Sequence, residues 1–262
     1  KAGFVQKGDV FIRPSPGSFP KIAFFPDSEP SMGLGHIRRC LGLATKLKEM
    51  GCFSAFFLSS NSFYRDLVIE NGFEVYSYTE RYSDITGLAV GADAVVIDSY
   101  QVEWGSISRK REHISLLVSF DDWNNPIEGP DVLINGSTGA GGQIRKNSGP
   151  QVYLYGPKYQ IIRREILSVS EMGTKSKGFN LLVTLGSGDS ENTIVLLLRI
   201  LDDILSVHPK LQVNVVIGAE MVLPEGSFSK NIKFVSATNL PEHLKLADIA
   251  WVSGGQSLIE AV

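Results

Sequence analysis

Short apolar runs alternate along the chain with stretches whose apolar residues recur at helical spacing. The first run, residues 21–26, predicts a buried strand. Residues 36–50 then predict an amphipathic helix whose apolar face consists of Ile37, Cys40, Leu41, Ala44 and Leu47. Further strands are predicted at residues 53–58, 73–76, 94–97 and 115–120. Because strands alternate with helices, we expect right-handed βαβ units and a mainly parallel sheet.

The same pattern returns in the second half of the chain. Residues 180–185 predict a strand, residues 186–192 a glycine-bearing loop and residues 193–207 an amphipathic helix. More strands are predicted at residues 213–217, 232–235 and 249–252, with a helix near residues 241–246. The sequence therefore predicts an α/β protein with two Rossmann-like lobes. We expect the carboxyl ends of their strands, which carry the ligand loops, to face a shared cleft.

Composition changes along the chain suggest where the lobes begin. Residues 1–20 are rich in glycine and proline and show no periodicity, so we interpret them as a leader or linker. Residues 21–167 are assigned to the first lobe and residues 168–262 to the second. The second lobe opens with a polar linker segment at residues 168–178. Since the sequence ends inside a predicted helix, we expect the second lobe to be incomplete at its carboxyl end.

Composition and charge narrow the class of protein. The 262 residues, 43% of them hydrophobic, can bury the cores of two domains. A formal net charge of −3 argues against a general phosphate-backbone binder, so no nucleic-acid partner is expected. Cys40 and Cys52 lie in predicted core segments, which suits free thiols in a reducing compartment. We find no apolar run of about 18 residues and no signal peptide, and expect a cytoplasmic protein without a membrane partner.

The first candidate site is the loop between the first predicted strand and helix. Gly33 and Gly35 allow a tight turn, and the helix that follows presents free N–H groups to an anion. The loop differs from the dinucleotide fingerprint, since Arg38 stands where a third small residue is expected. His36 at the start of the helix is either a structural histidine or a functional one. Its place in a glycine turn at the carboxyl end of a strand favours the functional interpretation.

Two loops of the second lobe have the character of a phosphate site. The first contains Gly186, Ser187, Gly188 and Asp189, whose backbone N–H groups could hold a diphosphate. An ordinary helix N-cap at Asp189 or Ser190 is the alternative, but a cap alone does not require two glycines. The second loop leads into a helix and supplies Gly254, Gly255, Gln256, Ser257 and Glu260. Its two glycines let phosphate approach the backbone, and Glu260 could accept hydrogen bonds from both ribose hydroxyls.

Acidic residues also follow two strands of the first lobe. Asp98 and Tyr100 come at the end of one strand, where a site role and a loop cap are equally plausible, and Asp121-Asp122 follows the next. The sequence contains no Gly-x-Ser-x-Gly elbow and no His-Glu-x-x-His pair, which disfavours a serine hydrolase or a zincin. No acidic cluster has the spacing of a metal site, so neither a metal nor another cofactor is expected.

Several of these motifs occur in an order that resembles a known family. They are Met32-Gly33-Leu34-Gly35-His36 with Arg39-Cys40-Leu41, then Asp98-Ser99-Tyr100, Asp121-Asp122, Asn135, Gly156-Pro157-Lys158-Tyr159 with Arg163, and the two glycine loops. Over residues 21–262 the chain resembles the UDP-sugar hydrolases of pseudaminic-acid biosynthesis and related spore-coat polysaccharide proteins. That group shares the GT-B architecture with nucleotide-sugar glycosyltransferases of the MurG-like superfamily.

The resemblance implies hydrolysis of a UDP-linked 2,4-diacetamido-2,4,6-trideoxyhexose by attack of water at the anomeric carbon. His36 takes the place of the catalytic histidine, and Gly33, Gly35 and Arg39 are assigned to substrate binding with Asp98 and Tyr100. UDP is expected along the second lobe. Two departures from the family are present: its Gly-Gly-Ser-Asp loop reads Gly-Ser-Gly-Asp here, and its usual threonine is Ser257. The first departure changes the expected phosphate geometry, whereas the second keeps the hydroxyl.

Two alternatives to a hydrolase remain open. A glycosyltransferase of the same fold would use a sugar hydroxyl in place of water, and fold alone does not separate the two activities. A non-catalytic module that binds a nucleotide sugar is the third interpretation. The expected partner is in each case a UDP-sugar, with fusion or proximity to other enzymes of sugar-nucleotide metabolism.

Overall fold

The computed structural model describes most of the chain. The described residues are 5–7, 10–12, 19–29, 34–79, 85–105, 107, 114–123, 128–140, 152–167, 178–185, 191–217, 228–253 and 256–261. They form two compact units. The first consists of residues 1–32 and 36–161, and the second of residues 33–35 and 162–262.

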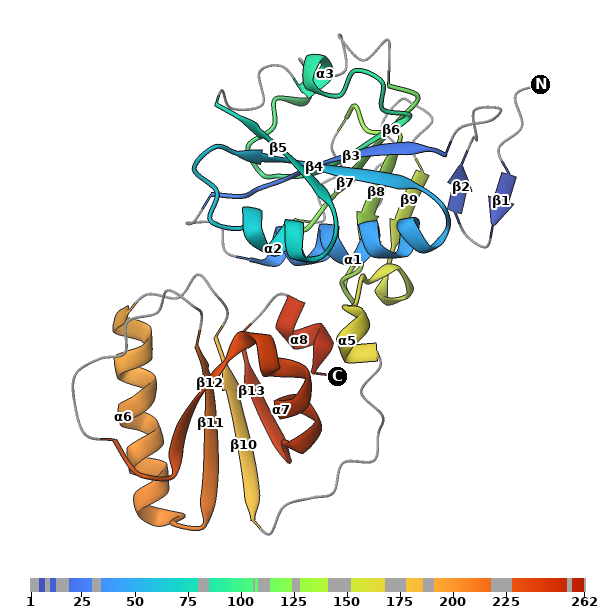
Figure 1. The fold of residues 1–262 in the computed structure, drawn as a ribbon. Coiled ribbons are helices and arrows are strands. Elements are labelled where there is room, and N and C mark those ends of the chain that lie inside the picture. The colour runs from blue at the N-terminus through green and yellow to red at the C-terminus, as the bar shows by residue number, and fades with distance from the viewer. Residues whose placement is uncertain are drawn as a thin grey trace. The chain divides into compact units, whose positions relative to one another are not determined.

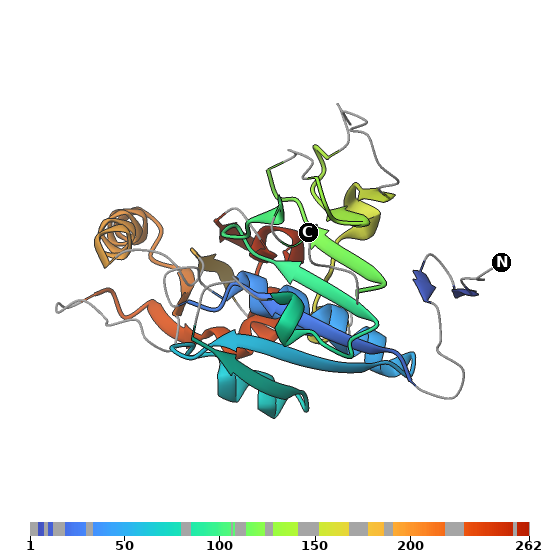
Figure 2. The same ribbon diagram turned by 90° about the horizontal axis from the view of Figure 1, so that it is seen from above.

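The first unit is built on a seven-stranded sheet in which every neighbouring pair is parallel. Its order is β5-β4-β3-β6-β7-β8-β9. The strands are β3 (Lys21–Pro26), β4 (Phe53–Ser59), β5 (Glu74–Tyr78), β6 (Ala94–Asp98), β7 (Leu116–Phe120), β8 (Val132–Asn135) and β9 (Val152–Tyr155). Figure 2 shows these strands from above, side by side in one twisted layer. The order reverses beside β3, which is the place where parallel α/β sheets form ligand sites.

Helices cover both faces of this sheet, as Figure 1 shows. Helices α1 (Gly35–Glu49) and α2 (Arg65–Glu70) lie on one face, and the short α3 (Ile85–Leu88) lies on the other. The predicted apolar face of α1 is buried against the sheet, where Phe24 stacks on Phe56 with ring centroids 5.0 Å apart. Two short elements, the 3-10 helix η2 (Pro157–Tyr159) and α5 (Arg164–Leu167), follow β9 along the chain.

The amino-terminal segment contains more regular structure than its composition suggests. Strands β1 (Val5–Lys7) and β2 (Val10–Ile12) pair antiparallel, with Val5 opposite Ile12. Strands β8 and β9 were also absent from the strands predicted by sequence. Each has only four residues and is partly exposed, so its apolar pattern is too short to identify it.

The second unit repeats the topology on a smaller scale. Its four parallel strands follow the order β12-β11-β10-β13, which matches the order β5-β4-β3-β6 of the first unit. The strands are β10 (Phe179–Thr184), β11 (Leu211–Ile217), β12 (Ile232–Ser236) and β13 (Ile249–Val252). The predicted repetition of strands and helices is thereby confirmed, together with the α/β class and the mainly parallel sheets.

The helices of the second unit also lie on the two faces of its sheet. Helix α6 (Glu191–Val207) packs on one face, and α7 (Leu240–Leu246) on the other after the 3-10 helix η3 (Ala237–Asn239) (Figure 1). Helix α8 (Gln256–Glu260) follows β13. Among the described residues, no helix combines the length and the apolar character needed to cross a membrane.

Candidate functional site

Polar side chains gather at the carboxyl edge of the first unit's sheet, beside the point where the strand order reverses. The last residues of β3 and β6, Pro26 and Asp98, lie opposite each other in the ladder. Asp27 directly follows β3 and Asp122 lies just beyond β7, while helix α1 begins at Gly35. The edge therefore brings together residues that are far apart in the sequence.

His36 and Asp98 form the centre of this cluster. Nδ1 of His36, the second residue of α1, lies 2.7 Å from Oδ1 of Asp98. The side chains are 7% and 1% exposed, respectively. An ionised carboxylate only accepts hydrogen bonds, so the neutral imidazole must carry its proton on Nδ1. Its Nε2 is then the basic nitrogen, which is the arrangement that a general base requires.

The pKa values of the pair are set by opposing effects. Burial lowers the pKa of His36, but the hydrogen bond and the charge of Asp98 outweigh it and leave the pKa raised above 6.5. Burial raises the pKa of Asp98, but the Arg39 charge and the hydrogen bond from His36 outweigh it and lower the pKa from 3.8 to about 2. Asp98 therefore remains ionised and His36 is a stronger base than a free imidazole.

Arg39 is held between two carboxylates. Its Nε and Nη2 donate to Asp98 at 2.8 and 2.6 Å, and its Nη1 and Nη2 donate to Asp122 at 2.6 and 2.8 Å. The guanidinium also lies over the ring of Phe120, 4.3 Å from the centroid. Four of its five N–H groups are thus committed within the cluster. Sequence reasoning assigned Arg39 to substrate binding, which stays a prediction. In the structure Arg39 contacts Asp98 and Asp122, and its charge favours the ionised form of Asp98.

Tyr100 is fixed by contacts at both ends. Its hydroxyl donates to Asp122 at 2.7 Å, and its backbone N–H donates to the buried Asp27 at 3.0 Å. Its ring meets His36 edge-on, with centroids 4.7 Å apart. Asp27 also accepts a 2.6 Å hydrogen bond from Ser99 Oγ. Sequence reasoning missed Asp27 as part of the site, although an acidic residue directly after the first strand was a usable signal.

A second polar group follows along the same edge. The Tyr155 hydroxyl, at the end of β9, donates to Asp121, which follows β7 and is buried. Asn135 ends β8 and accepts hydrogen bonds from the backbone N–H and the hydroxyl of Ser137. Its Nδ2 is buried and has no hydrogen-bond partner among the residues that the structure describes. Asp121 and Asn135 belong to the sequence motifs, whereas the role of Tyr155 depends on the unpredicted β9.

Strands β10 and β13 of the second unit lead into the two predicted loops at the carboxyl edge of its sheet. The backbone N–H of Ser253 donates to Thr184 at 3.0 Å, and the Ser253 hydroxyl donates to the carbonyl of Leu185. The loops that follow β10 and β13 therefore start side by side. Their predicted binding residues Gly186, Ser187, Gly188, Asp189, Gly254 and Gly255 lie outside the described residues, as do Gly33, which precedes α1 in the sequence, and the side chain of Gln256.

Glu260 and Ser257 lie on α8, just past the second of these loops. The carboxylate of Glu260 is buried, and both of its oxygens accept hydrogen bonds from the guanidinium of Arg163. Ser257, one turn earlier, is partly exposed. The predicted ribose carboxylate is therefore anchored by an arginine that sequence reasoning placed in a motif without giving it a role.

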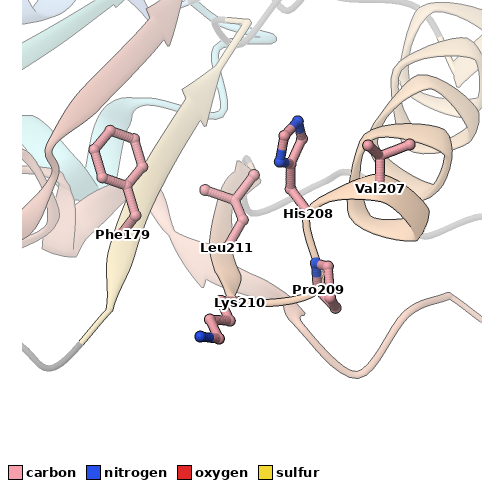
Figure 3. A pocket seen from close by; sticks show the side chains of 6 residues that line it. All are labelled: Phe179, Val207, His208, Pro209, Lys210 and Leu211. Carbon is pink, nitrogen blue, oxygen red and sulfur yellow. The ribbon is translucent and has the colours of Figure 1, made fainter.

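A mainly apolar pocket in the second unit is lined by none of these residues (Figure 3). It is formed at the amino ends of β10 and β11 by Phe179, Val207, His208, Pro209, Lys210 and Leu211. Ligand loops of parallel α/β sheets lie at the opposite, carboxyl ends of the strands. This pocket is consequently no part of the candidate site.

Comparison with known proteins bears mainly on the fold. No protein-family model matches the chain. An uncharacterized protein of Methanocaldococcus jannaschii is 30% identical over 261 residues, which cover 92% of this chain and 53% of that protein. The chain therefore spans about half the length of this relative.

Solved glycosyltransferase structures have a similar arrangement of elements. MurG of Acinetobacter baumannii has a TM-score of 0.55 at 13% identity, covering 92% of this chain and 74% of MurG. The spinosyn forosaminyltransferase SpnP has a TM-score of 0.59 at 11% identity, covering 93% and 78%. Anabaena Alr3699/HepE in complex with UDP and glucose has a TM-score of 0.51 at 10% identity, covering 93% and 78%. At such low identity the likeness concerns architecture alone: the chain has an α/β fold that matches the GT-B glycosyltransferases.

Proposed function

We propose that the chain is part of an enzyme that transfers a sugar from a nucleoside-diphosphate sugar to a hydroxyl acceptor, with His36 as the general base. The observation that carries this proposal is the buried hydrogen bond between His36 and Asp98. The GT-B-like fold supports the class of substrate, since a neighbour of that fold is described with UDP and glucose. The cluster around the pair supports a chemical role, because it holds one imidazole in a defined tautomer.

The step that the geometry allows is a single displacement. Nε2 of His36 removes the proton of the acceptor hydroxyl as the acceptor oxygen forms a bond to C1 of the sugar. The bond between C1 and the diphosphate oxygen breaks, and the nucleoside diphosphate leaves with that electron pair. Asp98 stabilises the imidazolium that forms and keeps the ring in position.

The nucleotide is proposed to bind to the second unit. The backbone of residues 186–189 and 254–255 would hold the diphosphate, and Ser257 and Glu260 would contact phosphate and ribose. The hydrogen bonds of Ser253 to Thr184 and Leu185 support this assignment, because they start both loops at one point of the sheet edge. Backbone N–H groups can bind a diphosphate without a cation, so we expect EDTA to leave UDP affinity unchanged. An obligatory Mg²⁺ requirement in calorimetry would contradict that expectation.

Water is the second candidate acceptor, which would make the enzyme a UDP-sugar hydrolase. The ordered motifs from Gly33 to Glu260 favour this candidate through their resemblance to the hydrolases of pseudaminic-acid biosynthesis. A general base acts on water as it acts on a sugar hydroxyl, so the His36–Asp98 pair serves both reactions.

The test is turnover of UDP- and TDP-linked sugars by the longest natural version of the protein, with and without added hydroxyl acceptors. The set includes a UDP-linked 2,4-diacetamido-2,4,6-trideoxyhexose. Release of nucleoside diphosphate that requires an acceptor establishes a transferase, and release of free sugar without one establishes a hydrolase. Binding of UDP without turnover of any sugar in the set would instead indicate a non-catalytic module and overturn the proposal.

A further inference from the structure

Two large exposed aromatic side chains are linked to His36 by ring contacts: Tyr100 contacts His36, and Trp123 contacts Tyr100. Trp123 is 74% exposed and Tyr100 is 49% exposed. Their ring centroids lie 5.7 Å apart at an interplanar angle of 58°. Most tryptophans bury much of their surface, so a ring left mainly in water beside a buried polar cluster is informative.

The position of this pair follows from the sheet. Tyr100 comes two residues after β6 and Trp123 three residues after β7, and these strands are neighbours. Both rings therefore belong to the carboxyl edge that holds the base. Trp123 directly follows Asp122, which binds both Arg39 and the Tyr100 hydroxyl.

Three contacts hold Tyr100 in place next to His36. Its hydroxyl, its backbone N–H and its ring edge are each held, by Asp122, Asp27 and His36 respectively. A ring restrained in this manner loses little conformational entropy when a ligand stacks on it. Trp123 contacts this restrained ring and is more exposed than it, so the two rings together form an exposed aromatic surface linked to His36 through Tyr100.

We propose that Tyr100 and Trp123 form a stacking surface for the pyranose ring whose atoms react at His36. This inference rests on the proposed function. A pyranose has one face of C–H groups, which packs on the electron-rich face of an aromatic ring, and hydroxyls around its rim. The carboxylate of Asp122, 30% exposed, lies beside the surface as an acceptor for such hydroxyls. The surface would hold either the sugar that is transferred or the sugar that accepts it.

The experiment compares Trp123→Ala with Trp123→Phe in the whole protein. Affinities for UDP and UDP-N-acetylglucosamine are measured by calorimetry, and KM is measured for the donor and the acceptor. We expect Trp123→Ala to weaken the sugar-dependent part of binding, or to raise the acceptor KM, by about tenfold, as lost stacking predicts. Trp123→Phe should keep sugar affinity and acceptor KM near the parental values, because a flat aromatic ring remains. Weaker affinity for the UDP-sugar with unchanged affinity for UDP would assign the surface to the transferred sugar. A raised KM for the acceptor alone would assign it to the acceptor sugar.

A second readout does not depend on turnover. The protein has three tryptophans, Trp104, Trp123 and Trp251. In an NMR titration with free N-acetylglucosamine, the indole N–H signal assigned by Trp123→Phe should shift, while the signals of Trp104 and Trp251 stay in place. Phe63→Ala is the matched control, since Phe63 is 63% exposed in the same unit but takes no part in the cluster.

Failure of this inference and failure of the proposed function give different results. If Trp123→Ala leaves both KM values and sugar affinity unchanged while His36→Asn abolishes turnover, the stacking surface is wrong and the enzyme assignment stands. If the Trp123 signal responds to sugar but no nucleotide sugar is turned over, the surface stands and the enzyme assignment is wrong. Equal losses in Trp123→Ala and Trp123→Phe, or an equal loss in Phe63→Ala, would overturn stacking as the cause.

Discussion

Arg163 and Glu260 form a buried ion pair within the second unit, in which Nε and Nη2 of the arginine donate to the two carboxylate oxygens of the glutamate. The side chains are 13% and 1% exposed. Arg163 and Glu260 are 97 positions apart in the sequence, and they meet next to the segment that predicts a nucleotide loop. The pair changes what a substitution of Glu260 should do, because the carboxylate has a structural partner as well as a proposed ligand.

Glu260→Ala is expected to destabilise the protein as well as to weaken UDP binding. Removing one partner of a buried pair leaves the other charge uncompensated, which costs about 3–5 kcal/mol of unfolding free energy. Denaturant unfolding of Glu260→Ala should show this loss, and the double variant Arg163→Met/Glu260→Met should recover most of it. If UDP affinity returns to the parental value in the double variant, Glu260 does not bind the ribose.

His36→Asn should remove most of the turnover and leave UDP affinity unchanged. A positioned general base contributes about 10²–10⁴-fold to the rate, so kcat should fall by that order. The nucleotide is assigned to the other unit, so calorimetry with UDP should give the parental dissociation constant. A histidine that only packs in the turn predicts the reverse, namely a lower melting temperature with kcat within a few-fold of the parent.

The pH dependence of kcat/KM should report the pKa of His36. His36 acts as a base in its neutral form. Burial lowers the pKa of His36, but the hydrogen bond and the charge of Asp98 raise it by more. Activity should therefore rise with pH through a pKa above 6.5. In Asp98→Asn the hydrogen bond from His36 to a carboxylate is lost. The acid limb of the pH profile should therefore move to lower pH, and kcat should fall. An unchanged limb in this variant would show that another group titrates.

Stability should depend on pH at the acidic end because of Asp98. Its pKa falls from 3.8 to about 2 on folding, although burial alone would raise it, because Arg39 and His36 favour the ionised form. A lowered folded-state pKa contributes stability that is present above pH 3.8 and is lost as the pH falls toward 2. The contribution is on the order of 2 kcal/mol. Denaturant unfolding between pH 5 and 2 should show a loss of this size that is absent in Asp98→Asn.

The opposite sign applies to His36. Its folded-state pKa is raised, so its contribution to stability is fully present below pH 6.5 and is lost as the pH rises through the folded-state pKa. Activity and this part of the stability therefore change in opposite directions over the same pH range. His36→Asn, measured in parallel, should abolish the stability change above pH 6.5.

Arg39→Lys separates a positioning role from a substrate-binding role. Lysine keeps the charge but cannot bond two carboxylates with a planar fork. Because Arg39 orients Asp98, we expect kcat to fall and the acid limb of the pH profile to shift, while the affinity for UDP and the donor KM stay near the parental values. A weaker affinity for UDP-sugar with an unchanged kcat would instead support the substrate-binding role that the sequence predicts for Arg39.

The repeated βαβ order and the core-facing side of α1 were predictable, because each depends on periodicity within a short segment. Ile37, Cys40, Leu41, Ala44 and Leu47 recur at helical spacing and are all buried. The partners of Arg39 were not predictable in this way. The guanidinium is 59 positions from Asp98 and 83 from Asp122, and only the alignment of the strand ends brings them together.

The same reason explains the other omissions. Trp123 directly follows the Asp121-Asp122 motif but belongs to no motif itself, and its interest comes from its contact with Tyr100, which follows the neighbouring strand β6. Tyr155 ends the four-residue β9, so the edge position of its hydroxyl depended on a strand that periodicity could not identify. Local patterns thus predicted the elements and several members of the site, whereas the contacts between members required the tertiary fold.

The cluster of His36, Arg39, Asp98 and Asp122 has a consequence for the order of charges during a reaction cycle. With a neutral imidazole, one guanidinium faces two carboxylates, so the group carries one surplus negative charge. Uptake of a proton by His36 brings the group to neutrality, and a balanced group costs less in a low-dielectric interior. Electrostatics therefore favour the step in which His36 accepts a proton as the bond to the sugar forms. Loss of that proton from His36, which restores the base, is disfavoured, and it must take place at a side chain of which only 7% is exposed.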